Sequence, residues 1–297
     1  MKIYDCFMFF DEEMLLDLRL NIMDKFVDKF VITEATYMHS GKPKKLKFDI
    51  KNFPKFRDKI IYNVIDKEPD NLETINKEDD SDTRGNKLIH NSVKRENYQR
   101  EMAKNSLTEA ANEDIILIND LDEIPNLNGL NLKNIKNKII IFKQKTFCYK
   151  FNLLYKNLMW YGSRACKKKN LISPQWLRNA KFRKYPIWRL DIILSKKKYN
   201  DIFYVQNGGW HFTNIKSPED LEKKFQNFLH HQDFETSNLN LEDIKKMVYN
   251  RRVLYDLEID QRNFKWSGKK ILEKVNLSEM PDYLLLNPEK YRKWIEN

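Results

Sequence analysis

The chain has 297 residues, of which 41% are hydrophobic and 13% are aromatic, and it carries a formal net charge of +11. This length and apolar content allow one large domain with a sizeable core, and they exclude a disordered chain. Only 7 glycines are present, and none forms a glycine-rich nucleotide loop of the Rossmann or P-loop type. The densest basic runs, at 42–47, 167–169 and 196–198, are short, so the charge indicates a solvated surface rather than a nucleic-acid groove.

The cysteines and the apolar segments bear on the cellular location. Cys6, Cys148 and Cys166 have neither metal-binding nor disulfide spacing, and a low odd count is typical of a reducing compartment. Lys2 and Asp5 interrupt the first apolar stretch, so no signal peptide is predicted, and no window approaches the ~20 apolar residues of a transmembrane helix. We expect a cytoplasmic protein, with peripheral association at the inner face of a membrane left open.

The first half of the chain alternates predicted strands and helices. In order, they are expected at 2–10 (strand), 12–25 (amphipathic helix), 30–34 (strand), 86–111 (helix) and 115–118 (strand). The segment 66–85 is polar and acidic and contains few large apolar residues. This composition predicts a mobile loop rather than a domain boundary.

Two features of this half are candidates for a ligand site. The second strand ends in Glu34, and the following loop at 35–43 carries turn formers and Lys42. A surface turn is the simpler interpretation of that loop, and a loop that wraps a phosphorylated or sugar ligand is the alternative. The long helix carries Arg100 and leads into the strand at 115–118, so this side chain could reach the same edge, although an exposed arginine is usually only solvated.

The most informative stretch is the strand at 115–118 and the carboxylates that follow it. Its unbroken apolar run predicts a strand buried on both faces, as in a parallel α/β sheet, and Pro125 is expected to stop it. Asp120, Asp122 and Glu123 cannot stay buried and unpaired, so they should lie where the strand leaves the core, where open α/β sheets bind ligands. Asp120 and Asp122 should point the same way and suit a hard cation such as Mg²⁺ or Mn²⁺. The D-x-D pattern alone does not decide this, because acidic turns after strands are common.

The second half is predicted to contain strands near 138–143, 146–155 and 202–205, an aromatic patch at 160–162 and helices near 173–180 and from 217 onward. Trp210 offers a flat face that can stack on sugar rings or bases. His211 could complete a metal site as a neutral imidazole, although a lone histidine is more often structural.

The remaining charged residues have simpler interpretations. Glu219 lies in the first turn of a helix, where acidic residues usually offset the helix dipole, and His230 and His231 fall near the end of that helix. No linker separates two folding units. We therefore predict a catalytic domain at 1–240 and a helical C-terminal extension at 241–297, packed on the same domain through an apolar anchor at 280–286.

Several separated motifs agree with one family pattern. They lie at 3–7, 30–36, 39–43, 96–100, 120–125, 208–213, 218–219, 231–234 and 280–283. Each is weak alone, but they occur in family order and span nearly the whole chain. Together they resemble the family 17 glycosyltransferases, the group that contains the enzyme adding the bisecting N-acetylglucosamine to N-glycans.

The resemblance implies a GT-A type fold, which is a Rossmann-like α/β sandwich with a mostly parallel central sheet. It also implies an inverting transfer from a nucleotide sugar, with UDP-N-acetylglucosamine as the suggested donor and Mn²⁺ or Mg²⁺ as the cofactor. The acceptor would be a glycan or glycolipid hydroxyl. Since no anchor or secretory signal is expected, a precursor of lipopolysaccharide, capsule or another surface glycan is favoured over an N-glycan.

The resemblance further implies roles around the metal. Asp122 is expected to hold the metal that bridges the diphosphate, Asp120 to contact the metal or the ribose, and His211 to bind the metal or the diphosphate. The base that takes the proton from the acceptor hydroxyl is expected to be Glu219, which matches the Pro-Glu of the family, with Glu123 in reserve.

The donor pocket is also assigned by resemblance. Glu34 and the loop at 39–43 are expected to line the nucleotide pocket, and Trp210 to contribute a flat face. Lys42 and Arg100 are candidates to neutralise the charge that develops on the diphosphate.

One alternative from another class is a metal-dependent nucleic-acid-binding protein or nuclease, suggested by the net charge and the acidic pair. The basic residues do not gather on one predicted helix face and no nucleic-acid module is present, so no specific nucleic-acid partner is expected. A sugar-binding protein without activity is a third possibility, disfavoured by the intact Asp120 and Asp122.

Overall fold

The structure is a computed structural model that describes residues 1–181, 188–189, 195, 197–227, 234, 237, 239–258, 265–266 and 268–296. His230 and His231, which belong to the predicted helix end and to the segment at 231–234, lie outside the described residues.

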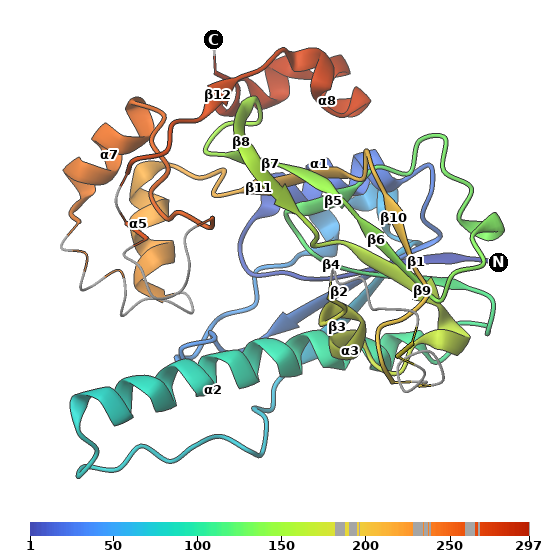
Figure 1. Ribbon diagram of the computed structural model, residues 1–297, viewed down its shortest axis with the longest axis horizontal. Helices are drawn as coiled ribbons and strands as arrows, with labels where there is room; N and C mark the ends of the chain where they lie inside the picture. Colours follow the sequence, from blue (N-terminus) through green and yellow to red (C-terminus); the bar gives the residue numbers. More distant parts are fainter. Residues whose placement is uncertain are drawn as a thin grey trace.

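A seven-stranded sheet forms the centre of the fold (Figure 1). In spatial order its strands are β10 (Ile202–Val205), β6 (Ile139–Phe142), β9 (Arg164–Lys167), β4 (Ile115–Asp120), β1 (Ile3–Met8), β2 (Lys29–Ala35) and β3 (Ile60–Ile65). Strand β9 is antiparallel to both neighbours, and the other adjacent pairs are parallel. The prediction of an α/β fold with a mostly parallel central sheet is confirmed, although the half-exposed edge strand β3 was not predicted.

A second sheet of five strands was also not predicted. Its order is β12 (Glu273–Lys274), β8 (Leu153–Trp160), β7 (Gln144–Cys148), β11 (Gly209–Thr213) and β5 (Glu123–Pro125). The buried strand β4 ends at Asp120, and Pro125 instead ends β5, so the chain changes sheets within the acidic segment. This crossing places the predicted carboxylates between the two sheets.

The single strand predicted over 146–155 is two antiparallel strands, β7 and β8. The turn between them contains Tyr149 at a φ of +66°. The buried hydroxyl of Tyr149 accepts a hydrogen bond from Leu254 N (2.7 Å) and donates one to the carbonyl of Arg252 (3.1 Å). These contacts with residues far along the chain hold a turn that no local turn signal marks.

Six helices surround the sheets in the described part of the chain. They are α1 (Glu13–Met23), α2 (Ser81–Glu101), α3 (Pro174–Arg178), α5 (Pro218–Asn227), α7 (Leu241–Tyr249) and α8 (Asp282–Leu286). Helix α2 begins earlier than predicted because Asp80 caps it by accepting a hydrogen bond from Thr83 N (2.7 Å). It ends earlier as well, in a 3₁₀ turn at Met102–Leu107. Its first half, with the segment before it, projects from the body of the molecule (Figure 1).

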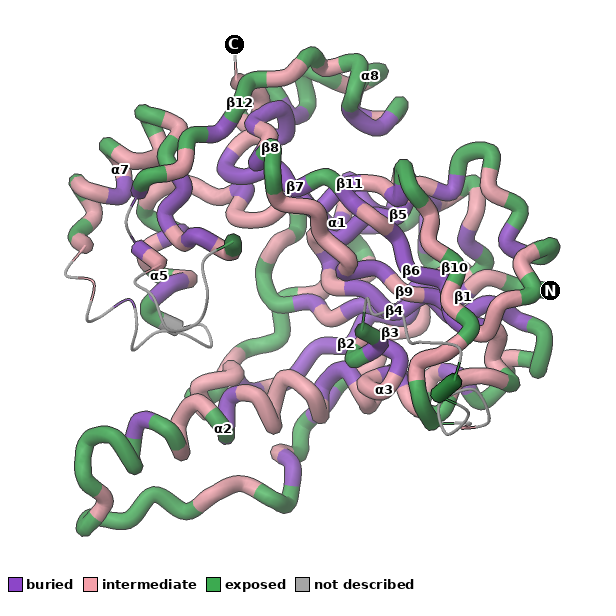
Figure 2. The backbone as a smooth tube through the Cα atoms, viewed as in Figure 1, coloured by how far each residue is buried: buried purple, intermediate pink, exposed green. Residues whose placement is uncertain are grey.

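The main core lies around α1, which is covered on more than one side. Leu16, Leu18 and Leu20 of this helix are fully buried, and Figure 2 shows that the central strands are buried along most of their length. On the outer side of α1, Tyr291 donates a hydrogen bond from its hydroxyl to Asp17 (2.6 Å). The helix is therefore more buried than its predicted amphipathic pattern indicates.

The C-terminal segment packs against both the core and the second sheet. Met280 and Leu284 are buried in the main core, as expected of the apolar anchor. Strand β12 pairs with β8, and Phe151 N donates to the carbonyl of Trp294 (2.8 Å). The segment is only partly helical in its described residues, since β12 and a 3₁₀ turn at Leu277–Glu279 lie between α7 and α8. Within the described residues, no helix has the length and apolar character needed to cross a bilayer.

Candidate active site

The acidic turn, residues 120–123, lies where the buried strand β4 leaves the core. Ile115 to Ile118 are buried, and the chain then turns at Leu121 and Asp122 before β5. The carbonyl of Asp122 accepts a hydrogen bond from Phe212 N of β11 (2.8 Å). The predicted position of the three carboxylates, at the end of the strand, is thus confirmed.

Arg19 of α1 holds the backbone of the acidic turn from inside the protein. Its side chain and that of Asp5 are both fully buried, and its Nε and Nη2 donate to the two Asp5 oxygens (2.8 and 2.6 Å). Its Nη1 donates to the carbonyl oxygens of Asp120 (3.2 Å), Leu121 (3.2 Å) and Glu123 (2.7 Å). One guanidinium therefore fixes the turn relative to β1 and α1. No local sequence signal marks this residue, which lies in an ordinary apolar helix pattern.

Arg178 of α3 binds the side chains of the same turn. Its Nη2 donates to Asp120 (2.6 Å), and its two terminal nitrogens bind the two oxygens of Glu123 (2.6 and 2.8 Å). Trp160 Nε1 also donates to Glu123 (2.5 Å). Burial by itself would lower the pKa of Arg178, but the carboxylates of Asp120 and Glu123 outweigh burial and raise it.

Arg100 reaches the acidic turn, as expected. Its Nη2 donates to Asp120 (3.0 Å) and to Glu96 (2.7 Å), and its Nη1 donates to Gln175 (2.8 Å). The carboxylate of Asp120 is therefore held between Arg100 and Arg178. Its oxygens are already used by the protein.

The structure argues against Glu123 as the reserve base. This carboxylate is fully buried, and although burial opposes its ionisation, Arg178 holds its pKa well below the usual range. A general base needs a pKa closer to the operating pH and access to the proton that it takes. Glu123 instead serves as an internal counter-ion.

Among the described residues, Asp122 is the carboxylate of the turn that no arginine binds. Its side chain is 23% exposed, and Nε2 of His211 lies 3.7 Å from its Oδ2. Burial raises the pKa of Asp122 to about 7, and Lys224 opposes this shift. Burial also lowers the pKa of His211 to about 4, so the imidazole is neutral at neutral pH. Trp160 stacks on His211 with ring centres 4.6 Å apart.

A preformed three-ligand metal site does not occur among the described residues. Of the predicted set, Asp122 and His211 lie together, whereas Asp120 is engaged by two arginines. A carboxylate oxygen beside a neutral imidazole nitrogen is nevertheless a donor set that fits Mn²⁺ or Mg²⁺. The two side chains would leave most coordination positions to substrate oxygens and water.

Glu34 anchors the loop after β2. It is fully buried, forms an ion pair with Lys44, and accepts hydrogen bonds from Lys47 N (2.8 Å), Phe48 N (3.1 Å) and the hydroxyl of Tyr62 (2.8 Å). Its carboxylate is thus occupied by the protein. Any contact of this region with a nucleotide would come from the loop that Glu34 positions, where Lys42 is exposed.

The position of Trp210 corrects its predicted role as a flat face for the donor. Successive residues of a strand point to opposite faces, so Trp210 points away from His211 and the acidic turn. Its ring is 9% exposed and packs in the main core, and its Nε1 donates to the carbonyl of Glu279 (2.8 Å). The indole beside the acidic turn is that of Trp160.

Glu219 lies in the first turn of α5 with half of its side chain exposed. A hydrogen bond from its own backbone N–H lowers its pKa, and Lys245 of α7, 3.5 Å away, adds to the effect. These contacts match the simpler interpretation of Glu219 as a helix-terminal acid. None of the residues that bind its carboxylate in the described part of the chain belongs to the acidic turn.

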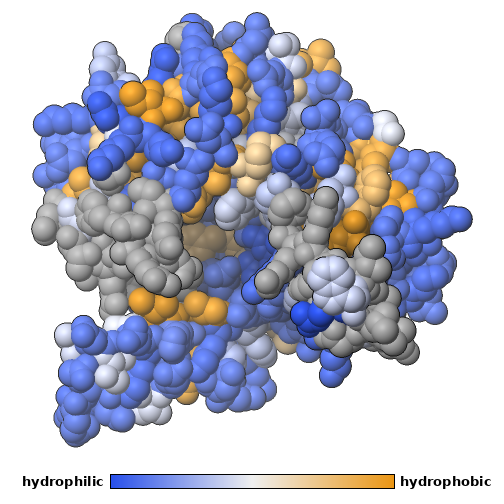
Figure 3. All heavy atoms as spheres, viewed as in Figure 1, coloured by the Kyte–Doolittle hydropathy of each residue, from blue (hydrophilic) through white to orange (hydrophobic). Residues whose placement is uncertain are grey.

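Two cavities meet at Trp160. One, of about 480 Å³, is lined from α2, α3 and the end of β8, and its arginines are Arg100, Arg164 and Arg178. The other, of about 280 Å³, lies on the side of His211 and α5. The face in Figure 3 is largely hydrophilic and is hollowed near its centre, above α2. Trp160, which donates to Glu123 of the acidic turn, lines both cavities.

Residues 1–295 match the family described as Glycosyltransferase family 17. The chain belongs to this family. Membership identifies the protein as a glycosyltransferase. No curated protein matches the chain. Among solved structures, that of HddC from Yersinia pseudotuberculosis is similar at 12% identity over 75% of this chain and 97% of that chain, with a TM-score of 0.30.

Replacing Arg19 by methionine should strongly destabilise this glycosyltransferase, because Asp5 would remain buried without its counter-ion. The expected loss is about 3–5 kcal/mol of the free energy of unfolding, measured by thermal or urea denaturation. Arg292→Met, at a side chain that is 75% exposed, is the matched control and should change stability little. An Arg19→Met protein as stable as the control variant would contradict the anchoring role.

Replacing Asp122 by asparagine should stabilise the metal-free protein at alkaline pH. The folded-state pKa of Asp122 is raised from 3.8 to about 7, so the cost of its ionisation is absent below about pH 4, grows as pH rises and is complete above about pH 7. The variant should gain roughly 2 kcal/mol at pH 8 and little at pH 4, measured from melting curves in a chelating buffer. A stability difference that does not depend on pH would contradict an unpaired, buried Asp122.

Proposed function

We propose that this glycosyltransferase is an inverting, metal-dependent enzyme of GT-A type. It moves N-acetylglucosamine from UDP-N-acetylglucosamine to a hydroxyl of a glycan or glycolipid acceptor in the cytoplasm or at the inner face of a membrane. Metal dependence is supported by the arrangement of Asp122 and His211. The carboxylate of Asp122, just after the end of β4, lies 3.7 Å from the neutral imidazole of His211. Membership in a glycosyltransferase family argues against the alternative that the protein is a nuclease.

In this proposal, Asp122 and His211 hold Mn²⁺ or Mg²⁺ together with the donor diphosphate. The bound metal acts as a Lewis acid that offsets the charge developing on the UDP leaving group. Asp120 does not need to bind the metal directly. Its contacts with Arg100 and Arg178 give it the different task of fixing those guanidinium groups beside the turn.

Arg164 supports an anionic ligand in the arginine-lined cavity. Its Nε and Nη1 donate to the carbonyls of Ala180 (3.0 Å) and Gly162 (2.7 Å), and it has no ion pair with a carboxylate of the described residues. Burial lowers its pKa to about 10, which leaves it charged at neutral pH. A diphosphate would supply the missing negative charge, and exposed Lys42 could approach from the loop after β2.

The acceptor hydroxyl must lose a proton as it attacks the anomeric carbon. Of the two candidate bases, Glu123 is locked in its ion pair, whereas Glu219 is ionised and exposed. Helix α5, which begins beside Glu219, also carries Lys224, whose charge acts on Asp122. We therefore retain Glu219 as the proposed base.

Release of UDP from UDP-N-acetylglucosamine should require both a divalent metal and Asp122. With Mn²⁺ and acceptor present, Asp122→Ala should lower the rate of UDP release by about 100-fold or more, because one of two protein ligands is lost. EDTA should abolish release, and excess Mn²⁺ should restore it. Asp220→Ala, an exposed acid of α5, is the control. Undiminished release by the Asp122→Ala enzyme would overturn the metal assignment.

Glu219→Gln should lower kcat for transfer by about 100-fold while leaving binding of UDP and Mn²⁺ unchanged, because the base acts on the acceptor only. Steady-state transfer assays measure the first quantity, and the thermal shift with UDP and Mn²⁺ measures the second. Glu242→Gln removes the other carboxylate that pairs with Lys245 and serves as the control. Equal kcat values for the two variants would eliminate Glu219 as the base.

A further inference from the structure

The smaller cavity beside Trp160 combines aromatic walls with a few polar groups. It has a volume of about 280 Å³. The lining residues that matter here are Tyr155, Trp160, His211, Asn214, Lys224 and Tyr255. Apolar walls with a small number of fixed polar groups are typical of small-molecule sites. The volume is below that of most drug-sized sites, which favours a ligand about as large as one sugar ring.

One buried atom of this lining lacks a hydrogen-bond partner. His211 is 5% exposed, and its Nδ1 has no partner among the described residues. A buried polar atom left in this state costs stability, and a neutral imidazole offers one donor and one acceptor. A ligand hydroxyl can play either role, so it satisfies Nδ1 in both tautomers. Because His211 lines the cavity, we expect a hydroxyl bound there to become the partner of Nδ1.

The aromatic walls fit the apolar face of a pyranose. Tyr155 is held in place by a hydrogen bond from its hydroxyl to buried Asp256 (2.5 Å). Tyr255 packs edge-on against Trp266, with ring centres 5.0 Å apart, and Lys265 Nζ lies over the Tyr255 ring, 5.2 Å from its centre. At the polar end, Lys224 donates to Asn214 (2.9 Å), which fixes an amide beside the cavity. Rigid aromatic faces of this kind provide contact area with little loss of side-chain entropy.

Two lining residues of this cavity, Trp160 and His211, contact the acidic turn. Trp160 lines both this cavity and the arginine-lined one, and it donates to Glu123 of the acidic turn. We infer that the 280 Å³ cavity is the acceptor subsite, which takes one pyranose ring with a hydroxyl on Nδ1 of His211 and a stacking contact with Tyr255. This inference rests on the proposed function, in which the donor diphosphate occupies the arginine-lined cavity.

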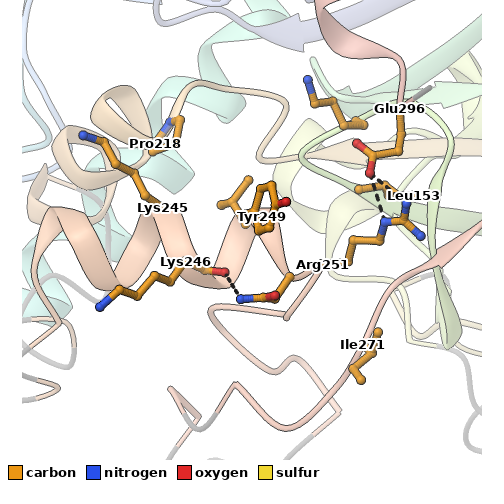
Figure 4. A pocket seen from close by; sticks show the side chains of 11 residues that line it. Leu153, Pro218, Lys245, Lys246, Tyr249, Arg251, Ile271 and Glu296 are labelled. Atoms are coloured by element: carbon orange, nitrogen blue, oxygen red, sulfur yellow. Dashed lines mark hydrogen bonds and ion pairs between the residues drawn. The ribbon is translucent and has the colours of Figure 1, made fainter.

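A larger open cavity of about 1110 Å³ elsewhere provides a comparison. Figure 4 shows Lys245, Lys246 and Tyr249 projecting from α7, with the ion pair of Arg251 and Glu296 across the cavity. Tyr249 is 86% exposed. None of the lining residues of this cavity, all of them described, has a buried polar atom without a partner. Tyr249 is therefore a matched control for Tyr255.

The test measures binding of the methyl glycosides of glucose, galactose, mannose and N-acetylglucosamine by saturation-transfer NMR, with and without UDP and Mg²⁺. At least one glycoside should bind the wild-type protein, and Tyr255→Ala should weaken its binding by at least about fivefold. Tyr255→Phe, which keeps the ring, and Tyr249→Ala should bind as the wild type does. Melting curves of all variants check that they fold.

A second measurement locates the sugar. The chain has 5 histidines, so ¹⁵N labelling of histidine gives few resonances, and His211→Gln identifies the signal of Nδ1. The bound glycoside should shift this resonance. Absence of glycoside binding, loss of binding in Tyr249→Ala but not in Tyr255→Ala, or an unmoved Nδ1 resonance would each overturn the inference. The thermal shift with UDP and Mn²⁺ reports separately on the donor, so failure of the proposed function is distinguishable.

Discussion

The buried ion pair of Arg19 and Asp5 is the constraint on which the active site depends. Burying two charges is expensive, and the cost is offset only when the remaining hydrogen-bonding capacity is satisfied. Here the guanidinium binds Asp5 through two nitrogens and donates its third to three carbonyls of the acidic turn. Asn119 adds a hydrogen bond to Asp5 (2.6 Å). The position of the turn is thereby coupled to β1 and α1, which form part of the main core.

Because the turn is anchored in this way, its three carboxylates can have different roles. Asp120 and Glu123 are neutralised by arginines, and both contribute to the rigidity of the turn. Asp122, between them, has no arginine or lysine partner within ion-pair distance among the described residues, and it is largely buried. An unpaired carboxylate would normally rotate into water or recruit a cation from the protein. It stays in place because its neighbours on both sides are fixed.

The sequence was informative where a pattern is local. The apolar run before Asp120 located both the buried strand and its acidic end, and the motif order indicated the family. Arg178 and Trp160 bind Glu123 from 55 and 37 residues away, so no local pattern marks them. Trp210 was misplaced for another reason. No strand was predicted over 209–213, and only its pairing within β11 shows that it and His211 face opposite ways.

Unsatisfied polar groups distinguish the acidic turn from the scaffold that anchors it. Arg19, Asp5 and Glu34 are fully buried, and each has several partners. Buried side-chain atoms without a partner in the described residues are Thr33 Oγ1, Ser40 Oγ, Arg100 Nε, Asn119 Oδ1, Thr146 Oγ1, His211 Nδ1, Asp256 Oδ2 and Trp266 Nε1. Three of these residues, Arg100, Asn119 and His211, contact or adjoin the acidic turn. Each such group costs free energy, and a polar ligand can recover that cost, which is a physical reason to expect the substrates at the turn.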